Sequence, residues 1–237
     1  MKRILVLQHS WECPPGTLGE ILEERGIVCE TLNVEEERIP APDGYATIIA
    51  LGGPQHVYEA EKYPYFATEK ELIRTAIAQD IPFLGICLGG QLLADTLGSP
   101  VKQHDITEIG FFAVPFTAEG ARDPLFAGLP GYQTVFHWHE DIFGLPREAT
   151  LLATSETTPN QAFRYGRRAY GLQYHIELNS ELFDLWLGLP AFKEAIIDSV
   201  GIDEFARIER DRRNQYETYR DHTRIMFENF LKIGNLL

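Results

Sequence analysis

Long apolar runs and a surplus of basic residues are both missing from this sequence. No apolar run reaches the roughly 18 residues that a transmembrane helix requires. The N-terminal segment Met1–Leu7 is too short for a signal peptide, and we interpret it as a first β-strand. Lys and Arg number 21 against 35 Asp and Glu, a net charge of -14, which would repel a phosphate backbone. We therefore expect neither a membrane nor a nucleic acid as a partner.

Paired cysteines are also missing. The three cysteines, Cys13, Cys29 and Cys87, are odd in number and lack CxxC spacing, which argues against a disulfide framework and against a thiolate zinc site. We therefore expect a protein of the reducing cytoplasm. Hydrophobic residues at 44% and charged residues at 24% are close to the averages for soluble globular proteins, so the chain is expected to fold alone.

The first half of the chain alternates strand-like runs with amphipathic segments. Helices are predicted at Thr17–Arg25 and Thr68–Gln79, with Thr68 as the N-cap of the second. The apolar runs are continuous, which is typical of a parallel sheet covered on both faces. This pattern predicts an α/β fold, a three-layer sandwich with a mostly parallel central sheet. The predicted strands are Ile4–Leu7, Ile27–Leu32, Ala46–Leu51 and Phe83–Ile86.

The second half changes from Ile109 onward to short strand-like runs separated by Pro, Gly and Asp turns. We interpret these runs as hairpins or mixed strands that continue the same sheet. The runs are Gly110–Phe116, Thr134–His137, Thr150–Thr154, Gln161–Arg164 and Ala169–His175.

The tail from Ser180 to Leu237 is helical in character. Within it, Asp203–Ile233 carries apolar residues at helical spacing, which predicts an amphipathic helix packed on the domain. A dimer or partner surface is the alternative interpretation. The apolar positions are Phe205, Ile208, Tyr216, Tyr219, Met226 and Phe230.

Cys87 lies where a buried strand passes into a helix. The segment Ile81–Leu93 has the form of a nucleophile elbow with Cys in the place of Ser. Such a turn strains the backbone and crowds the residues two positions away on either side, where Gly85 and Gly89 stand. The start of the following helix favours the thiolate, which is the attacking species. A buried structural cysteine is the alternative, but it would not need two flanking glycines.

A base and a carboxylate that orients it are predicted at His175 and Glu177. A thiol nucleophile needs a base within hydrogen-bond reach, and the base needs a third group to fix its tautomer. Residues two apart share one face of an extended strand, so Glu177 can hold His175 while His175 faces Cys87. An ordinary surface pair at the end of a strand is the alternative for an H-x-E pattern.

Both segments resemble motifs of class I glutamine amidotransferases. Gly85–Gln91 is similar to the G-x-C-x-G-x-Q elbow of this family, and Gly171–Glu177 is similar to its G-x-Q-x-H-P-E motif. Ile176 stands where many members carry Pro, which leaves the local loop geometry open. The resemblance covers about Arg3 to Glu177 and implies the flavodoxin-like fold of this family. It implies a catalytic triad of Cys87, His175 and Glu177.

An oxyanion hole is predicted from two backbone N–H groups. Attack on an amide creates an oxyanion, and one preorganised donor is worth about 3–4 kcal/mol in comparable sites. The N–H of Leu88, next to the nucleophile, is the first predicted donor. The turn Leu51–Tyr58 resembles the G-G-P oxyanion loop of the family, and the N–H of Gly53 is the second. A phosphate-binding loop is excluded because no Gly-Lys-Ser/Thr follows.

The resemblance also implies contacts to the substrate. Gln91 and the backbone around Gln173 and Tyr174 are expected to hold the α-amino and carboxylate groups of glutamine, although Gln91 could instead satisfy a hydrogen bond beside its helix. The segment Phe136–Asp141 resembles the H-x-H-x-D stretch that lines the pocket of stand-alone, GMP-synthase-like members, with Glu140 in place of the commoner Gly. This stretch is expected to bring three residues to the pocket, His137, Trp138 and His139.

Metal binding is the alternative for this stretch. His137 and His139 would share one face of a strand and could offer two imidazoles to an ion. No third ligand has convincing spacing in the sequence, so we predict no metal and no cofactor.

These features together predict a class I glutamine amidotransferase domain over residues 1–180 and a C-terminal helical extension over 181–237, packed on it. The predicted reaction is hydrolysis of the glutamine amide through a γ-glutamyl thioester on Cys87. No synthetase domain is recognised in the sequence, so a separate synthetase subunit or a homo-oligomer is the expected partner and the ammonia acceptor is unidentified. A cysteine hydrolase of other γ-glutamyl compounds, such as γ-glutamyl peptides, and a non-catalytic binding module are the alternatives.

Overall fold

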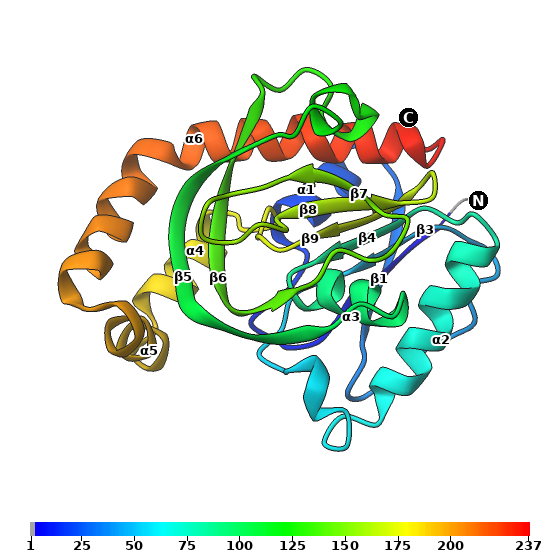
Figure 1. Ribbon diagram of the computed structural model, residues 1–237, viewed down its shortest axis with the longest axis horizontal. Helices are drawn as coiled ribbons and strands as arrows, with labels where there is room; N and C mark the ends of the chain where they lie inside the picture. The colour runs from blue at the N-terminus through cyan, green and yellow to red at the C-terminus, as the bar shows by residue number, and fades with distance from the viewer. Residues whose placement is uncertain (1–2) are drawn as a thin grey trace.

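The computed structural model describes residues 3–237, so the first two residues of the predicted N-terminal strand lie outside this range. In the described part of the chain, a seven-stranded sheet with the order β2-β1-β3-β4-β9-β8-β7 forms the centre (Figure 1). The strands from β2 to β9 in this order run parallel, and β8 and β7 continue the sheet antiparallel. These strands are β1 (Arg3–Gln8), β2 (Val28–Asn33), β3 (Tyr45–Ala50), β4 (Phe83–Ile86), β7 (Thr150–Ala153), β8 (Ala162–Tyr165) and β9 (Ala169–Leu172).

Helices cover both faces of this sheet. Alternate residues of β1 point to opposite sides: Ile4 and Val6 pack with α1 and α6, whereas Leu5 and Leu7 lie in the cluster that contains α2 and α3. Both faces are therefore buried, which explains why the strands are apolar without alternation. This confirms the predicted α/β architecture with a mostly parallel central sheet. The helices are α1 (Gly16–Glu24), α2 (Tyr65–Ala78), α3 (Leu88–Thr96), α4 (Ser180–Gly188), α5 (Pro190–Val200) and α6 (Ile202–Ile233).

One predicted continuation of the sheet is wrong. β5 (Val101–Pro115) and β6 (Tyr132–Phe143) do not join the central sheet, and they pair antiparallel with each other instead. Their aromatic face packs on α4, α5 and α6, with the rings of Phe111 and Phe136 against Phe183. The position of these two strands therefore depends on their packing against the apolar side chains of the C-terminal helices.

The predicted start of α2 is also wrong. Thr68 was expected to cap the helix, but α2 begins at Tyr65 and its N-cap is Pro64, which has helical dihedral angles. The fixed φ of proline suits the beginning of a helix, so the helix extends about one turn further back than the capping pattern indicated.

The three C-terminal helices wrap around the β5 and β6 ribbon and return to the central sheet, where α6 lies along one face (Figure 1). Five of the six predicted apolar positions of α6 are buried, and the exception, Tyr216, is half-buried. Within residues 3–237, no helix combines the length and the apolar character needed to cross a membrane.

Candidate active site

Cys87 occupies a strained turn between β4 and α3. Its φ of 51° and ψ of -108° lie in a region that residues with a side chain rarely adopt. A Cβ atom added to Gly85 would lie 2.4 Å from the carbonyl oxygen of Gly89, and one added to Gly89 would lie 2.2 Å from the carbonyl oxygen of Ala50. Larger residues at these two positions would displace backbone, so the elbow requires both glycines.

The surroundings of Cys87 suit a nucleophile. The cysteine is 6% exposed and immediately precedes α3, whose first N–H groups have no acceptors within the helix. Leu88, the first predicted oxyanion donor, is the first residue of that helix, so its N–H has no acceptor within the helix. The N–H of Cys87 itself donates to the carbonyl of Leu172 on β9 at 2.8 Å, which ties the elbow to the strand that leads to His175.

His175 and Glu177 form a buried pair. The Nδ1 atom of His175 lies 2.6 Å from Oε1 of Glu177, and Oε2 of Glu177 accepts from the backbone N–H of Ile176 at 2.9 Å. Burial disfavours the charged imidazole, but the Glu177 carboxylate and the Cys87 sulfur together raise the pKa of His175 well above its usual value. The pair therefore has the electrostatics of a base that accepts and holds a proton beside the sulfur of Cys87.

The backbone around His175 differs from the sequence prediction. The strand was expected to run through His175, but β9 ends at Leu172, and His175 forms an isolated antiparallel bridge with Phe136 of β6. The segment therefore depends on the neighbouring ribbon for its position.

The C-terminal helix α6 and the start of α1 hold the segment that follows His175. The hydroxyl of Thr223 donates to the carbonyl of Ile176 at 2.9 Å, and the N–H of Leu178 donates to the hydroxyl of Tyr219 at 2.9 Å. The N–H of Thr17 donates to the carbonyl of Glu177 at 2.8 Å. These contacts fix the loop although Ile176 replaces the family's proline.

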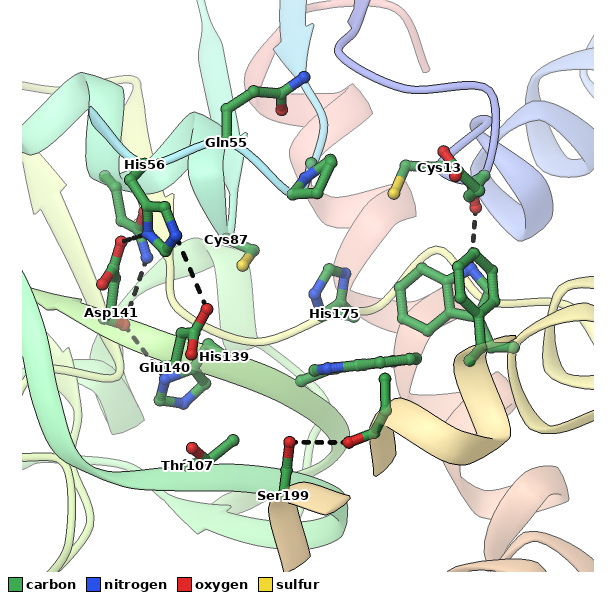
Figure 2. A pocket seen from close by; sticks show the side chains of 18 residues that line it. Cys13, Gln55, His56, Cys87, Thr107, His139, Glu140, Asp141, His175 and Ser199 are labelled. Atoms are coloured by element: carbon green, nitrogen blue, oxygen red, sulfur yellow. Dashed lines mark hydrogen bonds and ion pairs between the residues drawn. The ribbon is translucent and has the colours of Figure 1, made fainter. Parts of the chain in front are cut away.

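Gly52 lies against both Cys87 and His175. A Cβ atom added to Gly52 would lie 2.7 Å from Cε1 of His175 and 3.6 Å from Cβ of Cys87. The sulfur of Cys87 and the ring of His175 face the same pocket in Figure 2. The Gly-Gly-Pro turn therefore lies directly beside both side chains.

A buried contact between a histidine and a glutamate supports the Gly-Gly-Pro turn. His9 and Glu69 are fully buried, with Nε2 of His9 lying 3.0 Å from a Glu69 oxygen. The side-chain amide of Gln55 donates to the carbonyl of His9 at 2.8 Å, and a Cβ added to Gly53 would meet His9 at 2.7 Å. Sequence reasoning missed this support because His9 and Glu69 are far apart in the chain and neither belongs to a motif.

The pocket above Cys87 has a volume of about 310 Å³, which is at the small end of the range for small-molecule sites. Trp186 of α4 and Phe192 of α5 form part of its wall, so the C-terminal helices help to build the site. The indole N–H of Trp186 donates to the carbonyl of Glu12 at 2.8 Å, which fixes the wall to the loop after β1. The predicted residues that line the pocket are Gly53, Cys87, Gln91, Trp138, His139 and His175.

Three residues predicted to contact the substrate are not among those that line this pocket. Gln173 and Tyr174 are fully buried, and His137 is 1% exposed. Gln91 lines the pocket, and its side-chain amide donates to the carbonyl of Asp141 at 3.3 Å.

The part of β6 that carries Glu140 is held by His56. Nδ1 of His56 lies 2.7 Å from a carboxylate oxygen of Asp141, and its other ring nitrogen lies 3.7 Å from the half-exposed Glu140. Glu140, which replaces the family's glycine, is thereby placed at the mouth of the pocket beside the Gly-Gly-Pro turn (Figure 2).

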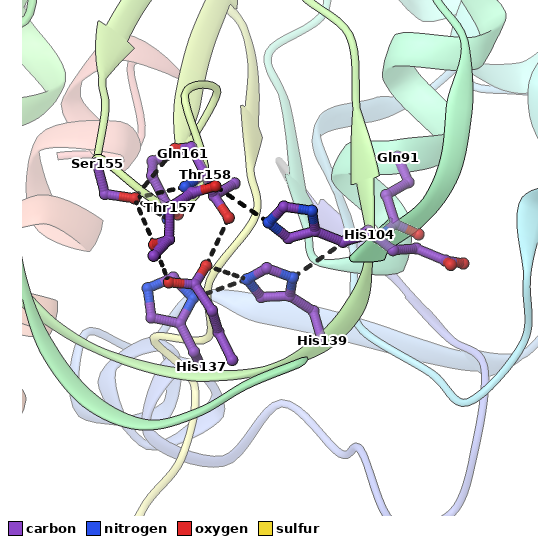
Figure 3. A network of polar contacts seen from close by, with 10 residues as sticks. Gln91, His104, His137, His139, Ser155, Thr157, Thr158 and Gln161 are labelled. Atoms are coloured by element: carbon purple, nitrogen blue, oxygen red, sulfur yellow. Dashed lines mark hydrogen bonds and ion pairs between the residues drawn. The ribbon is translucent and has the colours of Figure 1, made fainter. Parts of the chain in front are cut away.

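His139, which lines the pocket, and His137, which does not, belong to a polar network that the sequence did not reveal. Glu108 of β5 lies opposite His139 in the β5 and β6 pairing, and its carboxylate accepts from the hydroxyls of Thr157 and Thr158 (Figure 3). Sequence analysis found no third group beside the two histidines, because Glu108 reaches them only through an irregular register of the ribbon.

A family model and two known proteins match this chain. The family model "Glutamine amidotransferase class-I" matches residues 18–186. The glutamine amidotransferase-like protein YfeJ of Salmonella typhimurium is 40% identical over 186 residues, which cover 76% of this chain and 77% of that protein. A GMP synthase (glutamine-hydrolyzing) of Staphylococcus aureus is 34% identical over 163 residues, 66% of this chain but only 29% of that enzyme.

A solved structure is similar over almost the entire chain. The crystal structure of a glutamine amidotransferase from Thermotoga maritima has a TM-score of 0.87 and 32% sequence identity, and the match covers 98% of both chains. The similarity therefore includes the three C-terminal helices as well as the sheet.

Proposed function

Because this chain belongs to the class I glutamine amidotransferase family, we propose that it hydrolyses the side-chain amide of glutamine through a γ-glutamyl thioester on Cys87. The ammonia passes to an acceptor bound by a separate synthetase subunit. The observation that carries the proposal is the arrangement of Cys87, His175 and Glu177 at one pocket, with His175 held by Glu177 at 2.6 Å.

The reaction proceeds in two steps at this site. The sulfur anion of Cys87 attacks the amide carbon, and the resulting oxyanion accepts from the N–H groups of Leu88 and Gly53. The carbon–nitrogen bond then breaks as His175 gives its proton to the departing ammonia. A water molecule, deprotonated by His175, attacks the thioester, and glutamate leaves while the sulfur anion is restored.

The raised pKa of His175 suits this sequence of steps. An imidazolium that persists near neutral pH supplies the proton that the leaving group needs. Glu177 fixes the proton-bearing Nδ1 away from the sulfur, so that the other ring nitrogen serves the reaction.

A second function is supported by the apolar wall of the pocket. Trp138, Trp186 and Phe192 line a cavity that extends beyond the reacting pair, and aromatic walls bind leaving groups larger than ammonia. On this alternative, the same thioester forms from another γ-glutamyl compound, such as a γ-glutamyl peptide, and an amine is released instead of ammonia.

The test follows the leaving group and the intermediate in one experiment. Purified protein is incubated with glutamine and with γ-glutamyl peptides, and ammonia and free amine are measured separately. Hydroxylamine is added to capture the thioester as γ-glutamyl hydroxamate. We expect hydroxamate from wild type and none from Cys87→Ala, with ammonia from glutamine as the faster product.

Cys29→Ala serves as the matched control because Cys29 lies on β2, outside the residues that line the pocket. Faster amine release from a peptide would favour the second function over the first. Equal rates for wild type and Cys87→Ala on all substrates would exclude both.

A further inference from the structure

Three side chains outside the triad direct metal-binding atoms at one another. Glu108, His137 and His139 are all buried, and one ligand atom from each lies within 4.8 Å of the other two. The Nε2 atom of His139 lies 3.1 Å from Nδ1 of His137 and 3.1 Å from Oε2 of Glu108. Figure 3 shows the two imidazoles on one side of the β5 and β6 ribbon.

The protons available to these groups do not satisfy all of their contacts. Nδ1 of His139 lies 3.2 Å from the carbonyl oxygen of Asp141, which can only accept, so this nitrogen carries a proton. The remaining nitrogen, Nε2, faces two partners at the same distance. One proton on Nε2 cannot point at both His137 and Glu108, and without a proton its lone pair would face a carboxylate oxygen.

A metal ion resolves this conflict because it accepts a lone pair from every atom in the cluster. Bonds of about 2.0–2.1 Å at a tetrahedral angle separate ligand atoms by about 3.3 Å, close to the two separations of 3.1 Å. Two imidazoles and one carboxylate are the ligand set of known zinc sites that keep a fourth position for water or another group.

The groups around the cluster are those that orient metal ligands. The backbone carbonyl of Asp141 accepts from His139, which fixes the tautomer with Nε2 free to coordinate. The hydroxyls of Thr157 and Thr158 donate to the two oxygens of Glu108 at 2.5 and 2.6 Å, respectively. Hydrogen-bonded carboxylates and imidazoles of this kind are typical of the shell around a metal site.

We propose that Glu108, His137 and His139 bind one divalent transition metal ion, and that zinc is the ion they fit best. The nitrogen and oxygen ligands and their small number match zinc rather than calcium or magnesium, which take more oxygen ligands. The ion links β5, β6 and the loop that contains Thr157 and Thr158. Because His139 also lines the pocket, the ion stabilises the wall that carries Trp138.

The experiment measures metal binding directly, independently of any reaction at Cys87. Protein purified without chelator is analysed for metal content, stripped by dialysis against a chelator, and titrated with Zn²⁺ and with Co²⁺. We expect one ion per chain, visible absorption bands of tetrahedral Co²⁺, and a midpoint of thermal unfolding that falls on stripping and is restored by Zn²⁺.

Variants distinguish this site from adventitious metal. Glu108→Gln keeps the size of the side chain and should abolish stoichiometric binding. Thr158→Val should weaken zinc affinity about 10- to 100-fold. His104→Gln is the matched control, because His104 is a half-buried histidine of β5 that contacts the carbonyl of Thr157 outside the cluster. This variant should bind zinc as wild type does.

The proposal is overturned if stripped wild-type protein, still folded by circular dichroism, binds neither ion and keeps its unfolding midpoint. In that case the cluster is a network of hydrogen bonds and an ion pair. Equal binding by wild type and Glu108→Gln would overturn it as well, since the ion would then be held elsewhere.

Discussion

The two halves of the proposed catalytic site reach their positions by different means. Cys87 is placed by its own neighbours, because Gly85 and Gly89 allow a turn whose shape follows from a few consecutive residues. His175 is placed by distant parts of the chain, through its bridge to Phe136 and through the hydrogen bond from Thr223 of α6 to the next residue. Short motifs can therefore specify a nucleophile completely while specifying its base only in part.

The largest expected effect on activity and stability comes from disrupting the turn at Cys87, which neighbouring residues specify. Gly85→Ala would place a methyl group 2.4 Å from a backbone oxygen, and overpacking of this kind costs about 3 kcal/mol. We expect activity to fall at least about 100-fold, as a displaced reacting group does, and the unfolding midpoint to fall by roughly 6–12 °C.

Gly188→Ala is the control for this change, since an added Cβ at Gly188 meets no atom within 4 Å. Thermal unfolding and glutaminase assays measure both variants. A Gly85→Ala protein that is as stable and as active as the control would show that the elbow does not need this glycine.

The next largest effect is expected from a change to the pair formed by His175 and Glu177. Glu177→Gln keeps the shape but removes the charge that holds the imidazole in one tautomer and raises its pKa. We expect kcat to fall by about 10²- to 10⁴-fold, because loss of the orienting carboxylate in a comparable triad costs about 10⁴-fold. Steady-state kinetics measure the change, and an unchanged kcat would contradict the role assigned to Glu177.

The same substitution makes a prediction about pH. The folded pKa of His175 is raised above its unfolded value, so the stability from its ion pair is fully present below about pH 6.5 and is lost as pH rises through the folded pKa. The difference in unfolding free energy between wild type and Glu177→Gln should therefore be largest between about pH 5 and 6.5 and should shrink at alkaline pH.

Denaturant unfolding at a series of pH values measures this trend, and the ring protons of His175 in NMR spectra report its pKa directly. We expect the pKa of His175 to be lower in Glu177→Gln than in wild type. A difference in stability that grows with pH would contradict the ion pair.

The smallest expected effect comes from removing a contact by which α6 supports the segment next to His175. Thr223→Val removes the hydrogen bond to the carbonyl of Ile176 without changing the size of the side chain. The cost should be about 1 kcal/mol, a fall of roughly 2–4 °C in the unfolding midpoint, with a modest loss of kcat because His175 is adjacent.

Thr75→Val is the matched control, because the hydroxyl of Thr75 is exposed and donates to a carbonyl within its own helix. Equal changes in kcat for both variants would mean that α6 does not position the base.

The sequence predictions were accurate where the structure depends on neighbouring residues and inaccurate where it depends on distant ones. Phe83–Ile86 was predicted as a strand and is β4, and the residues at both ends match because an apolar run and an adjacent turn are local signals. The place of β5 and β6 was predicted wrongly, since nothing in their residues tells whether their apolar face meets the sheet or α4 to α6. Glu108 was missed for the same reason, as its neighbours come from the strand opposite.

By itself, the sequence determined the alternation of buried strands and helices, the bend at Cys87, and membership of the family, because each depends on residues that follow one another closely. Only the tertiary structure decided that α4 and α5 form part of the pocket wall and that Glu108 joins His137 and His139. These contacts arise between segments far apart in the chain. They depend on how the apolar surfaces of those segments pack together, and no local preference of the backbone determines them.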